Sequence, residues 1–169
     1  MRFLFLIIHI GSLEPVKEPS FRGVVELSYG SFAAFKMPPA EMTEAIRDCH
    51  QINGRIPRIN NENDFDKIGE MNFKADMAIH GGSWISYIDG TLNGDIEHDG
   101  NGKWYDYYDK DIIEYLPWQS HPTEQPNELG VSCVGLHYYG KGDKRNGLGD
   151  YPCRMVEGDP IAFCYYKVM

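Results

Sequence analysis

Apolar residues recur at steps of three and four between residues 40 and 52, which places them on one face of a helix. The positions on that face are Met42, Ala45, Ile46, Cys49 and Ile52. Asn53-Gly54 follows as a stop signal. A second helix is predicted to begin at Asn60 or Asn61, either of which can cap it, and to end before Asn72. Its inward positions are Phe65, Ile68 and Met71.

Runs of apolar, β-branched and aromatic residues predict strands before and after these helices. The predicted strands cover residues 24–27, 31–35, 84–88, 133–139 and 161–166. Between residues 88 and 133 the chain is rich in Gly, Asp, Asn, Pro and Tyr, which predicts a long loop system. A loop of that length in one domain is typical of a functional segment. Strands, two helices and then strands with loops indicate an α+β fold.

The N-terminal pattern predicts export. Residues 1–12 contain one arginine, an apolar run too short to cross a bilayer, and the small pair Gly11-Ser12, which together indicate a secretory signal peptide. The alternative is a buried first strand. Residues 13–27 are expected to form a leader and a first strand, and residues 28–166 a single domain. We expect a secreted, extracellular protein that does not insert into a membrane.

Charge and cysteine content narrow the possible partners. The chain carries 16 basic and 25 acidic residues, a net charge of -9, which argues against nucleic acid and anionic membrane surfaces as ligands. Its four cysteines, an even number in an exported chain, favour two disulfides, for which three pairings exist. The spacing contains no Cys-x-x-Cys pair, so a structural zinc site is not expected.

Motifs for catalysis are missing from the sequence. There is no His-Glu-x-x-His pair, no Gly-x-Ser-x-Gly elbow and no phosphate-binding glycine loop. We therefore expect a binding protein and not an enzyme.

Several short motifs follow one another in a characteristic order. They are Gly54-Arg55-Ile56-Pro57-Arg58-Ile59, Trp84-Ile85-Ser86-Tyr87, Gln125-Pro126-Asn127, Cys133-Val134, Gly149-Asp150-Tyr151-Pro152-Cys153 and Ala162-Phe163-Cys164. In this order the chain resembles the C-type lectin-like domain family, in its four-cysteine form, over residues 28–166. The resemblance implies two helices flanking a small twisted antiparallel sheet, with a long loop region that binds the ligand. It also implies the disulfide pairs Cys49–Cys164 and Cys133–Cys153.

The same resemblance implies a site for Ca²⁺ and carbohydrate. In sugar-binding relatives a cis proline turns two neighbouring side-chain oxygens toward one calcium, and Gln125-Pro126-Asn127 fits that pattern. The implied metal ligands are Gln125, Asn127, Glu128 and Asp150, and Trp118 is a candidate for stacking on a sugar ring. A carbohydrate or a glycoprotein is the implied ligand.

Departures from the family pattern keep a second hypothesis open. Val131 stands where the family usually places an acid, and Gly149 stands where an asparagine is usual. Gln-Pro-Asn is also a hybrid of the mannose-type and galactose-type signatures, so it names no sugar. The alternative is a domain of the same fold that has lost the calcium site and binds a protein ligand, with Gln125-Pro126-Asn127 serving only as a turn.

A second acidic pattern lies in the long loop. Asp95, Glu97, Asp99, Gly100 and Asp106 occupy positions of an EF-hand calcium loop. The twelfth position is aspartate in place of glutamate, and no helix pattern flanks the segment, so a solvated acidic loop is the expected state.

Overall fold

The computed structural model describes residues 19–73, 82–89, 91–92, 96–97, 103–122, 124–126, 133–154 and 160–169. Its helices are α1 (Met42–Gln51) and α2 (Glu62–Phe73). The strands are β1 (Ser20–Leu27), β2 (Gly30–Pro39), β3 (Ser83–Ile88), β4 (Thr91–Leu92), β5 (Ile96–Glu97), β6 (Tyr105–Asp106), β7 (Cys133–His137), β8 (Gly147–Tyr151) and β9 (Ile161–Lys167). The predicted signal peptide, residues 1–12, and most of the predicted leader lie outside the described residues.

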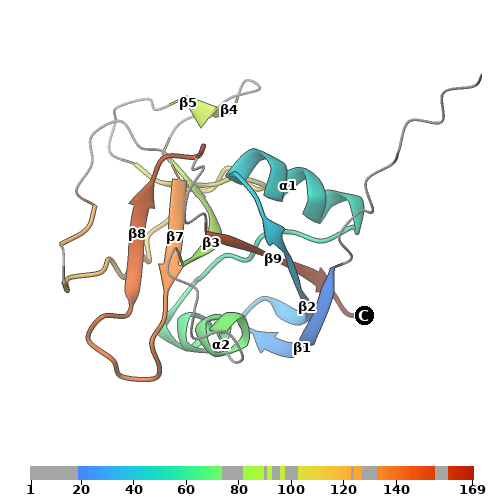
Figure 1. Cartoon of the computed structure of the whole chain (residues 1–169), viewed down its shortest axis with the longest axis horizontal. Coiled ribbons are helices and arrows are strands. Elements are labelled where there is room, and N and C mark those ends of the chain that lie inside the picture. Colours follow the sequence, from blue (N-terminus) through green and yellow to red (C-terminus); the bar gives the residue numbers. More distant parts are fainter. Residues whose placement is uncertain are drawn as a thin grey trace, which may run out of the picture.

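Most strands join one sheet in the order β1-β2-β9-β3-β7-β8 (Figure 1). Strand β6 pairs with β3. The neighbouring strands run antiparallel, except that β3 and β9 are parallel where Ser83 meets Ile161. Helices α1 and α2 lie on either side of this sheet (Figure 1). The predicted α+β arrangement of two helices flanking a small sheet is confirmed.

The core has two parts because strand side chains alternate between the faces of the sheet. Trp84 and Ile88 of β3 pack in the cluster that contains the buried residues of α1. Ile85 and Tyr87 pack in the cluster that contains Phe65 and Ile68 of α2. Every residue of β3 is buried, so this strand is the centre of the domain.

Both helices form where the apolar periodicity predicts them, with differences at their ends. After α1 it is Asn53, with φ 55°, that takes the left-handed conformation predicted for the Asn53-Gly54 stop. Asn61 caps α2, since its Oδ1 accepts the Asp64 N–H at 3.0 Å. The expected end of α2 before Asn72 is wrong: the helix runs to Phe73 because the Asn72 side chain is satisfied inside the core. Asn72 Nδ2 donates to the Ser83 hydroxyl at 2.9 Å, and the Tyr165 hydroxyl donates to Asn72 Oδ1 at 2.8 Å.

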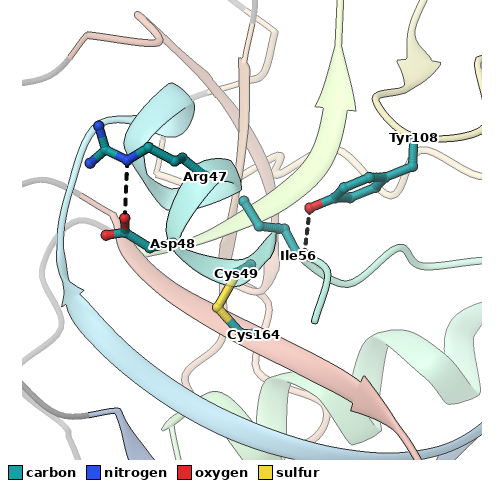
Figure 2. The surroundings of a disulfide bond; sticks show 6 residues. All are labelled: Arg47, Asp48, Cys49, Ile56, Tyr108 and Cys164. Atoms are coloured by element: carbon teal, nitrogen blue, oxygen red, sulfur yellow. Dashed lines mark hydrogen bonds and ion pairs between the residues drawn. A yellow bond between two sulfur atoms is a disulfide. The ribbon is translucent and has the colours of Figure 1, made fainter. Parts of the chain in front are cut away.

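Both disulfides have the pairing that the resemblance implies. Cys49 of α1 is bonded to Cys164 of β9, and Figure 2 shows this bridge fastening the helix to the sheet. Cys133 of β7 is bonded to Cys153, just beyond β8. No described helix has the length and the apolar character needed to cross a membrane.

Candidate functional site

Gln125 is held beside β8 by a chain of backbone hydrogen bonds. Its N–H donates to the carbonyl of Gln119 at 2.8 Å, and the Gln119 N–H donates to the carbonyl of Leu148 at 2.9 Å. The side chain of Gln119 is buried and donates to the carbonyl of Arg145 at 2.6 Å. Gln119 therefore connects the predicted ligand-binding loop to the sheet.

The segment around Trp118 runs along β8 as a short parallel partner. The Leu148 N–H donates to the carbonyl of Pro117 at 2.9 Å, and Trp118 forms a parallel bridge with Leu148. This close approach requires a glycine, because a Cβ on Gly147 would lie 2.4 Å from the Cα of Gln119. The sequence pattern predicts neither a strand at residues 147–151 nor a role for Gln119 or Gly147.

The side-chain oxygen of Gln125 is the unusual feature of this region. Gln125 Oε1 is buried and has no hydrogen-bond partner in the described part of the chain. A buried carbonyl oxygen without a partner costs about 1 to 3 kcal/mol. The Gln125–Pro126 peptide bond is cis. An oxygen placed in this way is suited to accept a hydrogen bond from a ligand or to contact a cation.

Asp150 supplies a carboxylate on strand β8. It is 4% exposed, and its backbone pairs with Val134 of β7. Asp150 lies two residues beyond Leu148, so the two side chains are on the same face of β8. The remaining predicted ligands, Asn127 and Glu128, lie outside the described residues.

The described residues supply only part of a calcium site. Calcium takes six to eight oxygen ligands, and Gln125 and Asp150 offer donors of that type. Within the described ranges no group of three or more His, Cys, Asp or Glu residues is placed to hold a metal. The donor chemistry fits calcium, but a complete site requires oxygens from other residues such as Asn127 and Glu128.

Trp118 is packed against the protein. Its ring is half-buried and meets the ring of Trp104 edge-on, with 5.2 Å between the ring centroids. The predicted stacking of Trp118 on a sugar stays a prediction, and its contact with Trp104 gives it a role in packing the loop.

Gly149, which stands where the resemblance implies an asparagine, lies next to the side chain of Tyr151. A Cβ on Gly149 would lie 3.1 Å from the ring and from the hydroxyl of Tyr151. That hydroxyl also makes a close contact with Nε2 of His137. Burial lowers the pKa of His137 below its ordinary value. An asparagine at position 149 would therefore need the ring of Tyr151 to move.

Of the EF-hand-like residues, only Asp106 has a described side chain. Asp106 is buried, and its carboxylate accepts hydrogen bonds from the Ser86 hydroxyl at 2.6 Å and from the N–H groups of Tyr108 and Asp109 at 2.8 and 2.9 Å. These contacts give it a structural role in the turn after β6. Asp95, Asp99 and Gly100 lie outside the described residues.

Neither a protein-family model nor a curated protein sequence matches the chain. Solved structures do match. The carbohydrate-recognition domain of the mouse scavenger receptor C-type lectin is 18% identical with a TM-score of 0.57, over 89% of this chain and 96% of that chain. The C-type lectin domain of murine dendritic cell inhibitory receptor 2, solved with an N-glycan, is 17% identical with a TM-score of 0.57, over 81% and 91%.

A third similar structure is a Ca²⁺-dependent type II antifreeze protein in its Ca²⁺-free form. It is 15% identical with a TM-score of 0.56, over 80% of this chain and 92% of that chain. At these identities the likeness concerns the fold, which in this chain consists of two helices and a multi-stranded sheet. The chain therefore has the fold of the C-type lectin domain.

Proposed function

We propose that the protein is secreted and binds carbohydrate outside the cell, with calcium, at a site formed by Gln125, Asn127 and Asp150. The fold supports this function, because the similar structures include a carbohydrate-recognition domain and a C-type lectin domain in complex with an N-glycan. The two disulfides are of the kind found in proteins of oxidising compartments.

The observation that carries the proposal is the buried Oε1 of Gln125, which has no hydrogen-bond partner among the residues that the structure describes. The loop is tied to β8 through Gln119 and Leu148, two residues before Asp150 in the same strand. A neutral oxygen and a carboxylate are thus attached to one edge of the sheet. A cation or a sugar hydroxyl would give the Gln125 oxygen the partner that the described residues do not provide.

Calcium would be held by Gln125, Asn127, Glu128 and Asp150, and it would supply open coordination positions to two sugar hydroxyls. With two neutral amides and two carboxylates, the affinity falls in the weak extracellular range, with a Kd of about 10⁻⁴ to 10⁻³ M. The family's asparagine is missing at Gly149, so one neutral ligand is lost. The site therefore needs millimolar calcium to fill.

The test combines calcium titration by calorimetry with a glycan array read in calcium and in chelator. Gln125→Ala and Asp150→Asn should each weaken calcium binding by roughly tenfold or more, the equivalent of about 1.4 kcal/mol. Gln51→Ala and Asp111→Asn change the same residue types at exposed positions and should leave both readouts unchanged. Glycan signals that persist in chelator, or that survive Asp150→Asn, would refute the calcium mechanism.

A second candidate function is supported by the fit between Gly149 and Tyr151. Because the Tyr151 ring lies beside Gly149, an asparagine at this position would require the ring to move. This favours a domain of the same fold that binds a protein partner without calcium. Absence of both calcium binding and glycan binding in the experiment above, in the presence of an intact fold, would favour this second function.

A further inference from the structure

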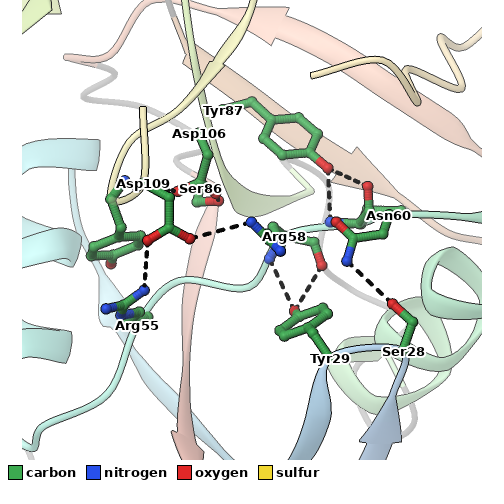
Figure 3. A network of polar contacts seen from close by, with 11 residues as sticks. Ser28, Tyr29, Arg55, Arg58, Asn60, Ser86, Tyr87, Asp106 and Asp109 are labelled. Carbon is green, nitrogen blue, oxygen red and sulfur yellow. Dashed lines mark hydrogen bonds and ion pairs between the residues drawn. The ribbon is translucent and has the colours of Figure 1, made fainter. Parts of the chain in front are cut away.

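A cavity of about 360 Å³ lies among the loop after α1, the turn after β6 and the end of β9. We call it the arginine pocket and define it by its cationic residues Arg55, Arg58 and Lys167 and by Tyr29, Tyr108 and Asp109. Figure 3 shows Arg55, Arg58, Tyr29 and Asp109. Its volume is within the range of about 300 to 1,000 Å³ that is typical of small-molecule sites. None of the predicted calcium or sugar ligands lines it.

Two tyrosine rings hold the two guanidinium groups in place. The guanidinium carbon of Arg55 lies 5.1 Å from the ring centroid of Tyr108, and that of Arg58 lies 5.2 Å from the ring centroid of Tyr29. The rings are fixed in turn: the Tyr108 hydroxyl accepts the Ile56 N–H at 2.9 Å (Figure 2), and the Tyr29 hydroxyl donates to the carbonyl of Arg58 at 2.8 Å (Figure 3). The arginines are therefore positioned before any ligand arrives.

The carboxylate of Asp109 bridges the two arginines. Its Oδ1 lies 3.2 Å from Nη1 of Arg55 and its Oδ2 lies 3.2 Å from Nη1 of Arg58 (Figure 3). Each guanidinium has five N–H donors, and Asp109 engages one donor on each. Asp109 is 42% exposed, so it can leave this position without unfolding its surroundings. Its contacts are those that a ligand carboxylate would make.

The charge of the pocket is positive although the chain is acidic. Three cationic residues face Asp106 and Asp109. Asp106 is buried and accepts three hydrogen bonds, one from the Ser86 hydroxyl of β3 and two from backbone N–H groups of its own turn, so Asp109 is the anion that faces the arginines. In a chain of net charge -9, such a concave cationic surface attracts small anions selectively.

We propose that the arginine pocket is a second ligand site, for a small carboxylate with an apolar face, in which Asp109 occupies the place of the ligand carboxylate. The ligand carboxylate bridges Arg55 and Arg58, and its apolar part lies against the aromatic wall formed by Phe32 and Tyr29. This site is independent of the proposed calcium site, so either proposal can fail without the other.

The test is a titration of the whole chain with benzoate, followed by NMR, with benzyl alcohol as an uncharged probe that has the same phenyl ring. The wild type should bind benzoate weakly and benzyl alcohol not at all. Asp109→Asn removes the internal competitor and should tighten benzoate binding by roughly tenfold. Arg58→Gln removes half of the carboxylate contact and should weaken it by roughly tenfold.

Arg47→Gln is the matched control, because Arg47 is an exposed arginine of α1 paired with Glu44 and Asp48 and is not part of the pocket. It should leave the benzoate affinity unchanged. Asp109→Ser is the second variant if Asp109→Asn does not fold. Benzoate binding that is no tighter in either Asp109 variant, that survives Arg58→Gln, or that falls equally in Arg47→Gln would overturn the proposal.

Discussion

The arginine pocket and the region around Gln125 differ in how their polar atoms are satisfied. In the arginine pocket, Asp109 pairs with two guanidinium groups and the tyrosine hydroxyls bond to backbone groups. Beside β8 the backbone is equally well bonded, but the Gln125 side-chain oxygen lacks a partner among the described residues. A ligand must displace Asp109 in the first region, whereas in the second it adds a contact that the described residues do not make.

The two regions also depend on different crosslinks. Arg55 exchanges two backbone hydrogen bonds with Tyr165 of β9, next to the Cys49–Cys164 bridge, at 3.0 and 2.7 Å. The Gln125 region is attached to β8, whose end is fastened by Cys133–Cys153. The comparison therefore predicts that damage to one region leaves the other largely intact.

Removal of the disulfides should have the largest effect on stability. The Cys49–Cys164 bridge spans 115 residues and the Cys133–Cys153 bridge spans 20. The chain-entropy estimate gives about 5 kcal/mol for the first and about 3 kcal/mol for the second. We expect Cys49→Ala/Cys164→Ala to lower the urea midpoint more than Cys133→Ala/Cys153→Ala, measured by circular dichroism and fluorescence.

Ligand binding by the same variants sharpens this comparison. The variant without Cys133–Cys153, where it is still folded, should lose calcium binding and keep benzoate binding at the arginine pocket. Equal loss of both activities would show that the two regions are not held separately, and a smaller stability loss for the longer loop would contradict the chain-entropy estimate.

Asp106→Ala should have the next largest effect, about 2 to 3 kcal/mol of unfolding free energy. The buried carboxylate of Asp106 accepts three hydrogen bonds, and its loss leaves the Ser86 hydroxyl without this partner. Urea unfolding measures the change, with Asp111→Asn, an exposed acid of the same turn, as the control. Calcium binding should be unchanged, and its loss in Asp106→Ala would contradict the separation of the two regions.

Strong periodicity made the framework predictable from sequence. The helix around Cys49 and the buried strand from Trp84 to Ile88 follow from apolar spacing alone, and the resemblance implied the disulfide pairs that are observed. Strand β8 escaped prediction because Gly147 and Gly149 have no β propensity of their own. Both glycines are explained by close neighbours, Gln119 and Tyr151, that only the tertiary structure brings near.

The sites were predictable to different degrees. Gln125 and Asp150 could be singled out because the family pattern marks them, and both are placed on the β8 side of the fold. The arginine pocket could not be predicted, since Arg55 and Asp109 are far apart in sequence and surface charges pair in many ways. A pattern of alternating residues in 147–151, with Leu148 and Asp150 on one face, was the signal that would have located β8.

The smallest expected effect is a dependence of stability on pH through His137. Burial lowers the pKa of His137 in the folded state below the ordinary value of 6.5. As the pH falls below 6.5, the unfolded chain binds a proton that the folded chain does not, so the free energy of unfolding decreases. Urea unfolding at pH 7 and pH 5 should show a smaller decrease in His137→Gln than in the wild type.

His50→Gln is the control for this prediction, because His50 is exposed at the end of α1 and should leave the wild-type pH dependence in place. If His137→Gln keeps the full pH dependence, the buried histidine beside Tyr151 does not contribute to it.

The claim that the Gln125 side-chain oxygen contacts the bound ligand is tested most directly by the NMR signal of the Gln125 side-chain amide. During a titration with calcium, and then with a glycan that the array identifies, the Gln125 signal should shift strongly while that of the exposed Gln51 stays in place. If Gln125 does not shift while a ligand binds elsewhere on the protein, the account of this site is contradicted.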